Sequence, residues 1–341
     1  MKKVLSLVLA LALLCVCFAG CGNDNSNSSA PASSTAPASS AAGSSVADTS
    51  TGGEVYKIGV LAPAVTHGWV AGVAYYAEQR CKELSDAGEI EYKLLTSNNA
   101  EEMTSQIDDL RTWGAQAVVA FPQWEGMESP IQALIDDGIY VVNFDIEIKC
   151  NGVYRVSGDN EDMGRQSAQY IVDKVGNTGN VIMLNVPSSG SVSELRQKGF
   201  EEKMAEIAPD MNVETFATQF TREAGQKDFA DILATHEKID AVFSMDDETS
   251  IGVLNAIREA NRTDIKVITG GGGCQEYFKM MKDNADINIQ SALYSPVMVM
   301  DAVDNALSLL KGEKVEEVKI IPTTVVDKDN CDQYLDESSP Y

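Results

Sequence analysis

Short apolar segments alternate with amphipathic segments along most of the chain after residue 55. The first unit begins with an apolar run at 57–62, which is typical of a strand buried on both faces. After a polar turn at 66–69, apolar residues recur at the spacing of one helix face: Val70, Val73, Ala74, Ala77, Cys81 and Leu84. This pattern predicts a strand, a turn and a helix. In an open sheet of such units, ligands bind beyond the carboxyl ends of the strands, so the turn is a candidate for function.

The same unit repeats in two groups. In the first group we predict further strands and helices at 91–96, 101–113, 116–121, 129–137, 140–144, 154–158 and 162–175. In the second group we predict them at 181–186, 193–207, 213–217, 224–236, 241–245, 249–260, 266–269, from 275, 287–293 and 296–311. Alternation of this kind predicts an α/β fold with two doubly wound parallel-sheet lobes. The boundary near Gly158 has no flexible linker, which indicates a hinge and a cleft between the lobes.

The N-terminal 54 residues have a different composition. Two lysines followed by an apolar core predict a signal peptide at 1–20, since the core is short for a transmembrane span. Residues 21–54 are almost all small or polar and are predicted to form a disordered tether. Phe18-Ala19-Gly20-Cys21 resembles the lipobox of bacterial lipoproteins. This implies export and a lipid anchor at Cys21 on the outer face of the cytoplasmic membrane; an ordinary signal with an incidental Cys21 is the alternative.

Charge and cysteine content narrow the possible partners. The formal net charge is −25, and loss of Lys2 and Lys3 with the signal would make it −27. Such an acidic surface repels nucleic acid and anionic headgroups, so we expect neither as a partner. Four further cysteines are scattered without the spacing of a metal site, and their disulfide state stays open: Cys81, Cys150, Cys274 and Cys331. We expect a monomer with no cofactor and no metal.

Several short motifs occur in a specific order: KIGVL followed by HGW, AVVAFPQ, VVNFD, VSGDN, LRQKGF, IDAVFSMDDETSIGVLNAI and LLKGEKV. With the lipobox and the tether, this ordered set resembles the type I periplasmic sugar-binding proteins of the ribose-binding branch, which feed ABC importers. The resemblance implies three crossovers, near Gly158, Tyr294 and Pro322. It divides the folded part into a first lobe at 55–158 plus 295–322 and a second at 159–294 plus 323–341. It also implies an ABC permease as the membrane partner.

A sugar site needs flat aromatic rings for the ring faces and carboxylates or amides for the hydroxyls. The candidates in the first lobe follow predicted strands: His67, Trp69, Phe121, Gln123, Trp124 and Asp145. The resemblance implies that Trp69 lies against the sugar and that Asp145 accepts from two hydroxyls. A helix cap for Trp69, a core position for Phe121 and a turn cap for Asp145 are the alternatives. The family frequently has Arg after this aspartate, but here the residue is Ile146.

The candidates in the second lobe and at its crossover are Glu194, Phe220, Asp246, Gly272 and Tyr294. The resemblance implies a stacking role for Phe220 and a hydroxyl contact for Asp246, whereas Asp247 is assigned to capping the next helix. Glu194 falls where ribose-type proteins carry an Arg, and it also fits a capping box that starts at Ser191.

Further expectations concern Arg196, the glycine turn at 270–273 and Tyr294. Arg196 is expected to be structural. The resemblance implies a turn that carries a ligand-binding Asp at 270–273, but this chain has four glycines there. These glycines could bring backbone N–H groups to the ligand. Tyr294 replaces an amide and could donate to the ligand, with hinge packing as the alternative.

Ile146 and Glu194 stand where related proteins carry Arg, so this site has less positive charge and disfavours an anionic ligand. These residues therefore favour a neutral sugar or polyol. A cationic or amine-bearing solute is the alternative, with Asp145, Glu194 and Asp246 as its carboxylates among the aromatic rings. A ligand receptor for a sensor would use the same site. An enzyme is disfavoured, because the sequence has only two histidines and no recognisable nucleophile and base set; Asp145 with Asp246 is the one conceivable glycosidase pair.

Overall fold

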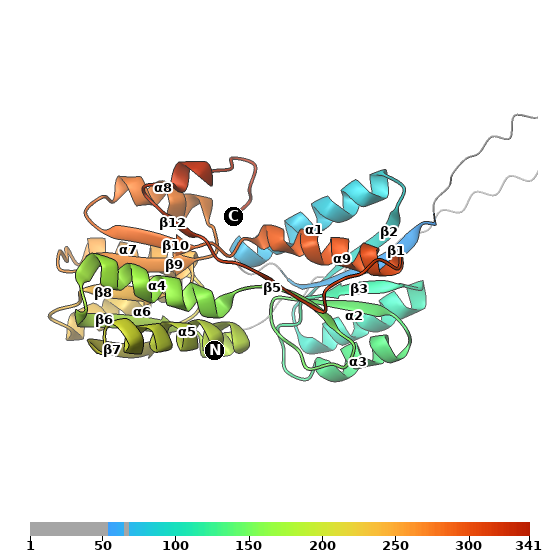
Figure 1. Cartoon of the computed structure of the whole chain (residues 1–341), viewed down its shortest axis with the longest axis horizontal. Coiled ribbons are helices and arrows are strands. Elements are labelled where there is room, and N and C mark those ends of the chain that lie inside the picture. The colour runs from blue at the N-terminus through green and yellow to red at the C-terminus, as the bar shows by residue number, and fades with distance from the viewer. Residues whose placement is uncertain (1–53, 65–67) are drawn as a thin grey trace, which may run out of the picture. The chain divides into compact units, whose positions relative to one another are not determined.

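The computed structural model describes residues 54–64 and 68–341, and the strands in this part of the chain form two six-stranded sheets (Figure 1). We call each sheet with its helices a lobe. The predicted signal peptide, Cys21, His67 and all but the last residue of the predicted tether lie outside the described residues.

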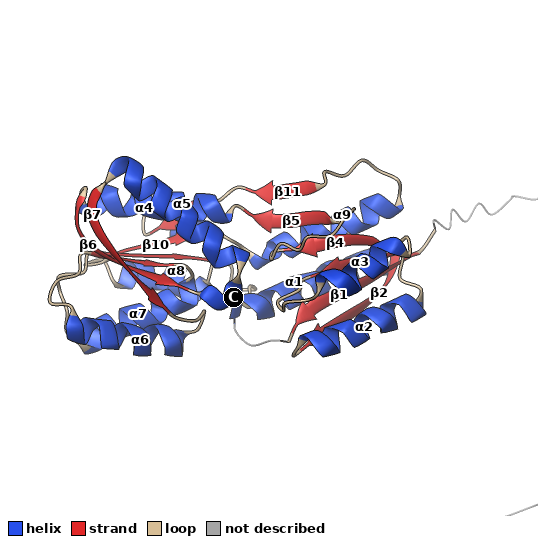
Figure 2. Ribbon diagram, turned by 90° about the horizontal axis from the view of Figure 1, so that it is seen from below, coloured by secondary structure: helices blue, strands red, loops and turns tan. Residues whose placement is uncertain are grey.

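The first lobe is formed mainly by the N-terminal part of the folded chain. Its elements are β1 (Tyr56–Pro63), α1 (Gly68–Asp86), β2 (Ile90–Ser97), α2 (Ala100–Trp113), β3 (Ala117–Ala120), α3 (Glu128–Asp136), β4 (Tyr140–Phe144), β5 (Tyr154–Gly158), α9 (Val299–Leu310) and β11 (Val318–Ile321). The strand order is β11-β5-β4-β3-β1-β2, and all neighbours are parallel. Helices cover both faces of the sheet (Figure 2), with α1 and α9 in one core and α2 and α3 in the other.

The second lobe repeats the arrangement. Its elements are α4 (Asn160–Val175), β6 (Thr178–Asn185), α5 (Ser191–Ile207), β7 (Asp210–Ala217), α6 (Arg222–Thr235), β8 (Ala241–Ser244), α7 (Asp247–Glu259), β9 (Val267–Gly271), α8 (Gln275–Asp283), β10 (Asn288–Ala292) and β12 (Val325–Asp327). The strand order is β12-β10-β9-β8-β6-β7, and only β12 is antiparallel to its neighbour. The predicted α/β fold is therefore confirmed.

Burial explains why the hydrophobic pattern predicts these elements. Strands β3 and β8 are buried along their whole length, as expected for strands covered on both faces. In α1, the predicted apolar stripe is buried at Val70, Val73, Ala77, Cys81 and Leu84. The sequence pattern missed β11 and β12, which are short and partly exposed strands at sheet edges.

Helices α4 and α5 pack closely against each other in the second lobe. A Cβ on Gly164 would lie 2.0 Å from the backbone oxygen of Arg196, and a Cβ on Gly199 would lie 2.0 Å from that of Glu161. The two helices therefore approach each other as only glycine permits, and this contact fixes the backbone of Arg196.

The chain passes between the sheets after β5, after β10 and after β11. Gly158, at the crossover after β5, contacts Tyr294, at the crossover after β10. A Cβ on Gly158 would lie only 2.3 Å from the Tyr294 ring. The ring is almost completely buried. Tyr294 thus connects two crossovers, which agrees with the hinge-packing alternative for this residue; the exact lobe limits stay a prediction.

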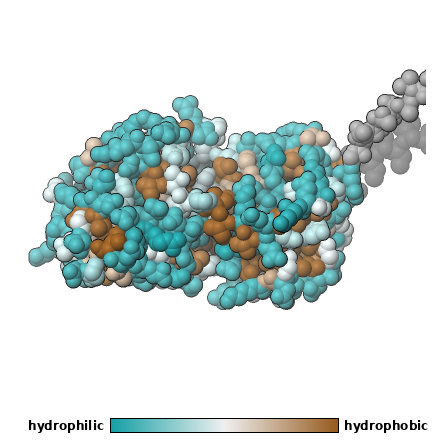
Figure 3. All heavy atoms as spheres, viewed as in Figure 1, coloured by the Kyte–Doolittle hydropathy of each residue, from teal (hydrophilic) through white to brown (hydrophobic). Residues whose placement is uncertain are grey.

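The surface seen in Figure 3 is mostly hydrophilic, with some hydrophobic side chains gathered where the two lobes meet. Within residues 54–64 and 68–341, none of the helices has the length and apolar content that a membrane span requires.

Candidate ligand-binding site

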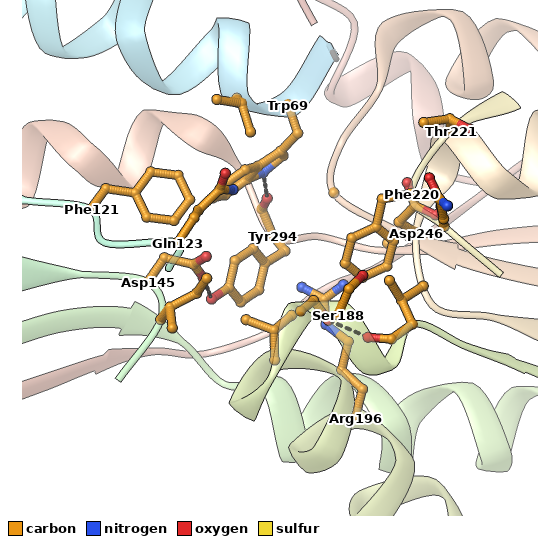
Figure 4. A pocket seen from close by; sticks show the side chains of 18 of the residues that line it. Trp69, Phe121, Gln123, Asp145, Ser188, Arg196, Phe220, Thr221, Asp246 and Tyr294 are labelled. Carbon is orange, nitrogen blue, oxygen red and sulfur yellow. Dashed lines mark hydrogen bonds between the residues drawn. The ribbon is translucent and has the colours of Figure 1, made fainter. Parts of the chain in front are cut away.

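A cavity of about 460 Å³ lies between the lobes (Figure 4). Its walls come from the segments that follow strands of both sheets, as the position of turns in parallel α/β sheets predicts. The first lobe contributes Trp69, Val70, Phe121, Gln123, Trp124, Asp145 and Ile146. The second lobe contributes Val186, Ser188, Ser189, Val192, Arg196, Gln219, Phe220, Thr221, Asp246, Gly271 and Gly272, while Tyr294 and Tyr341 complete the wall.

Aromatic side chains form the apolar wall on the side of the first lobe. The Trp69 ring is stacked with Phe144 at 6.2 Å between centroids and meets Phe121 edge-on at 5.9 Å. Its Nε1 donates a hydrogen bond of 2.7 Å to the backbone oxygen of Tyr294. The indole is therefore held on three sides and presents a fixed surface to the cavity, which suits the apolar face of a ring-shaped ligand.

Asp145 lies directly after β4 with a φ of 64°, a left-handed conformation in which Asp is among the tolerated residues. Its carboxyl is 4% exposed, and Oδ1 accepts a hydrogen bond from the Tyr294 hydroxyl. Burial raises the pKa of this carboxyl, while Tyr294 and the guanidinium groups of Arg196 and Arg155 act in the opposite direction. Among the described residues Oδ2 has no hydrogen-bond partner, so it is available to accept from a ligand hydroxyl.

Tyr294 lies at the crossover and lines the cavity as predicted, but its hydroxyl is already engaged by protein groups. Its hydroxyl donates to Asp145 and also contacts Ser157 Oγ at 3.1 Å and Asn160 Nδ2 at 3.2 Å. With its proton directed at Asp145, the hydroxyl is not a free donor for a ligand. Tyr294 instead positions both Asp145 and Trp69 from the crossover.

The assignment of Glu194 and Arg196 is reversed in the structure. Glu194 is exposed and is not among the residues that line the cavity, whereas Arg196 lines it and is 5% exposed. Arg196 Nε donates to Asn160 Oδ1 at 2.8 Å and Nη1 donates to the Met245 oxygen at 2.7 Å. The physical reason is the register of α5, which turns Arg196 inward.

The predicted capping box at the start of α5 is also absent. The helix begins after Gly190 without a side-chain cap. Ser193 Oγ instead accepts from the backbone N–H of Val186 at 2.9 Å.

Of the two aspartates after β8, Asp246 lines the cavity as predicted, but it also provides the cap of α7 that was expected of Asp247. Asp246 is the N-cap of α7 and accepts from the N–H groups of Glu248 and Thr249 while lining the cavity. Asp247 points behind the glycine turn, where Oδ2 accepts from the N–H groups of Gly273 and Cys274. Burial raises the pKa of Asp246 to about 7 and that of Asp247 to about 6.

The glycine turn therefore does not offer the N–H groups that the sequence suggested. Those of Gly273 and Cys274 are bonded to Asp247, and that of Gly272 donates to the Ala292 oxygen at 3.2 Å. Gly272 still lines the cavity, and its φ of 135° is a conformation suited to glycine.

The raised pKa of Asp246 predicts a pH-dependent stability. The pKa of its carboxyl is about 4 in the unfolded chain and about 7 in the folded one. The contribution of this group to the free energy of unfolding is therefore fully present below about pH 4 and is lost as the pH rises through 7. Asp246→Asn stays neutral and keeps a good N-cap. The variant should therefore gain in melting temperature over the wild type as the pH is raised from 5 to 8. Asp210→Asn, at an exposed position, is the control, and a pH-independent difference for Asp246→Asn would contradict the expectation.

The remaining predicted residues are distributed around the same cavity. Phe121 is buried beside Trp69, Trp124 is half-buried, and Gln123 is exposed at the rim. Phe220 lies across the cavity, where the Arg196 guanidinium is 5.7 Å from its ring centroid. Trp113 lies outside the lining and beneath Lys57 and Lys93.

Sequence reasoning missed several lining residues. Ser188, Ser189, Gln219 and Thr221 lie after β6 and β7, so the ends of these strands were an available signal. Tyr341 carried no such signal, because hydrophobic spacing does not show where a tail without regular structure will pack. Among the described residues, no group of three or more His, Cys, Asp or Glu side chains is arranged to hold a metal ion.

The fold and the cavity define a two-lobed solute-binding protein of the type I periplasmic class. The chain belongs to the family described as periplasmic binding protein domain, whose model matches residues 58–314. A ribose import binding protein of Haemophilus influenzae is 30% identical over 241 residues, which cover 67% of this chain and 79% of that protein. A xylitol-binding protein of Mycolicibacterium smegmatis is 26% identical over 294 residues, which cover 84% of this chain and 81% of that protein.

Solved structures support the same fold. A galactofuranose-binding protein superposes with a TM-score of 0.75 at 22% identity, covering 84% of this chain and all of that one. A periplasmic solute-binding protein of Actinobacillus succinogenes with bound D-allose superposes with a TM-score of 0.74 at 19% identity, covering 82% and 100%.

Proposed function

We propose that this protein captures a neutral sugar or polyol between its two lobes and delivers it to an ABC importer, without catalysis. The observation that carries the proposal is the composition of the cavity. Aromatic rings from both lobes are combined with a buried acceptor, Asp145, and a buried donor, Arg196, in a volume typical of small-molecule sites. The names of the ribose- and xylitol-binding relatives indicate the same ligand class.

The charges around the cavity favour a neutral ligand. The cationic alternative needs Glu194 as a third carboxylate, but this side chain is outside the cavity and a guanidinium lies inside it. Arg196 offsets the charge of Asp145, and the raised pKa of Asp246 leaves that carboxyl partly protonated near neutral pH. Hydroxyl groups, which both donate and accept, match this mixture of partners.

The proposed mechanism uses the two lobes as the two halves of one site. Trp69 and Phe121 would contact a ring face, while Asp145 and Arg196 would bind hydroxyls from opposite lobes. Only a conformation with both lobes close to the ligand makes all of these contacts, so ligand binding stabilises the closed form. The permease would recognise that form. We further propose that the signal at 1–20 directs export, that Cys21 carries the lipid anchor and that the protein acts as a monomer.

A thermal-shift screen tests the proposal. Residues 22–341, without Cys21, are measured with pentoses, hexoses, polyols, nucleosides and amines. A ligand that binds only the folded state raises the melting temperature as its concentration exceeds the dissociation constant. We expect a shift with at least one neutral sugar or polyol, whereas a shift with amines alone would contradict the proposed ligand class.

A further inference from the structure

The segment after β12 returns to the cavity, which Tyr341 lines. Beyond a short 3₁₀ turn at Cys331–Gln333, the side chain of Gln275 on α8 holds the chain at two points. Its Nε2 donates to the Tyr334 oxygen at 3.1 Å, and its Oε1 accepts from the N–H of Asp336 at 2.6 Å. These bonds fix the path of the segment that carries Tyr341, the last residue of the sequence.

The Tyr341 side chain lies between the two lobes. A Cβ on Gly68, at the start of α1, would be 2.8 Å from Tyr341 Cδ2, and a Cβ on Gly272 would be 2.6 Å from its Oη. Tyr341 also meets Gly72, whose Cβ would be 3.3 Å from the Tyr341 Cβ. Gly68, Gly72 and Gly272 thus leave the space that the Tyr341 side chain fills. Gly272 belongs to the glycine turn, and a side chain at this position would collide with the Tyr341 hydroxyl.

The Tyr341 side chain lines this cavity, and no hydrogen bond joins its hydroxyl to another of the described residues. The residue is 5% exposed. Burial raises the pKa of the phenol well above its usual range, so it remains a neutral donor. A ligand hydroxyl at this place would give the phenol a hydrogen-bond partner.

The ring forms a wall and leaves room for a ligand. The cavity retains about 460 Å³ with Tyr341 in place, which is within the usual range of small-molecule sites. A ring that blocked the site would leave little space between the aromatic wall of the first lobe and Phe220.

The geometry points to Tyr341 as a ligand-contacting, specificity-determining residue, which supplies from the tail the polar group that the glycine turn lacks. This inference rests on the proposed function, since it assigns one more contact to the same site. The contacted group is a hydroxyl of the sugar or polyol on the side of Gly272.

Calorimetric titration of the ligand found in the screen tests the inference. Tyr341→Phe removes only the hydroxyl and should weaken binding by about three- to tenfold. Tyr334→Phe is the matched control, because Tyr334 belongs to the same tail but lies against Phe278 outside the lining, and it should bind as the wild type does. Melting temperatures of the ligand-free proteins show that both variants fold.

A series of single-deoxy analogues of that ligand locates the contact. The analogue that lacks the contacted hydroxyl should bind the wild type and Tyr341→Phe equally well, whereas the other analogues should keep the difference between the two proteins. Equal binding of the complete ligand by the wild type and Tyr341→Phe would overturn the inference and leave the proposed function standing. Tighter binding by Tyr341→Ala would overturn it as well, by showing a tail that competes with ligand. A wild type that binds no sugar or polyol would overturn both.

Discussion

Asp145→Asn should weaken sugar or polyol binding by about 10- to 100-fold while leaving the fold intact. A hydrogen bond to a charged group contributes about 1.5–3 kcal/mol to the binding free energy. In the variant, the Asn side chain offers the ligand an amide NH₂ donor or a neutral oxygen in place of the free Oδ2 acceptor. Asn tolerates the left-handed backbone at this position and can still accept from the Tyr294 hydroxyl. The melting temperature of the ligand-free variant should therefore stay close to that of the wild type.

Glu125→Gln provides the control for this prediction. Glu125 is an exposed acid in the turn next to Trp124 and does not line the cavity, so its loss changes the charge near the rim without removing a contact. Calorimetric titration of both variants gives the affinities. An Asp145→Asn protein with wild-type affinity would remove Asp145 from the site.

Gly164→Ala should destabilise the second lobe by about 3 kcal/mol or more, which corresponds to a fall in melting temperature of roughly 5–10 °C. The added Cβ would lie 2.0 Å from the Arg196 oxygen and 2.6 Å from the Phe200 nitrogen, and both are backbone atoms that move only if α4 and α5 separate. Because this separation also displaces Arg196, the variant should lose affinity for the ligand as well.

Asp173→Ala, on the exposed side of the same helix, is the control and should melt near the wild type. Differential scanning calorimetry measures both. A Gly164→Ala protein that melts within about 2 °C of the wild type would show that the two helices are not packed backbone to backbone.

The elements of the fold could be predicted because each buried strand and each amphipathic helix has its own local pattern. The edge strands β11 and β12 could not, since they are short and lack a fully buried face. Candidate residues at strand ends, such as Trp69 and Asp145, line the cavity because turns at the carboxyl ends of parallel strands converge, and their contact with a ligand stays a prediction.

The errors in the site arose where packing between distant elements decides the outcome. Arg196 and Glu194 are two residues apart on one helix, and contacts with Asn160 and Met245, both distant in the sequence, hold Arg196 inward. Asp246 and Asp247 are both acceptable N-caps by residue type, and the choice depends on Gly273 and Cys274 far along the chain. Tyr341 reaches the cavity through a tail held by Gln275, a contact without a sequence pattern.

The measurement that tests the central claim most directly is a tryptophan-fluorescence titration of the Trp113→Phe variant. The three tryptophans of the chain are Trp69, Trp113 and Trp124, and this variant keeps only the two that line the cavity. We expect the sugar or polyol found in the screen to change the emission in a saturable way, with one ligand bound per chain. A ligand that raises the melting temperature but leaves this emission unchanged would bind elsewhere, and the absence of any change with neutral sugars and polyols at millimolar concentration would contradict the account.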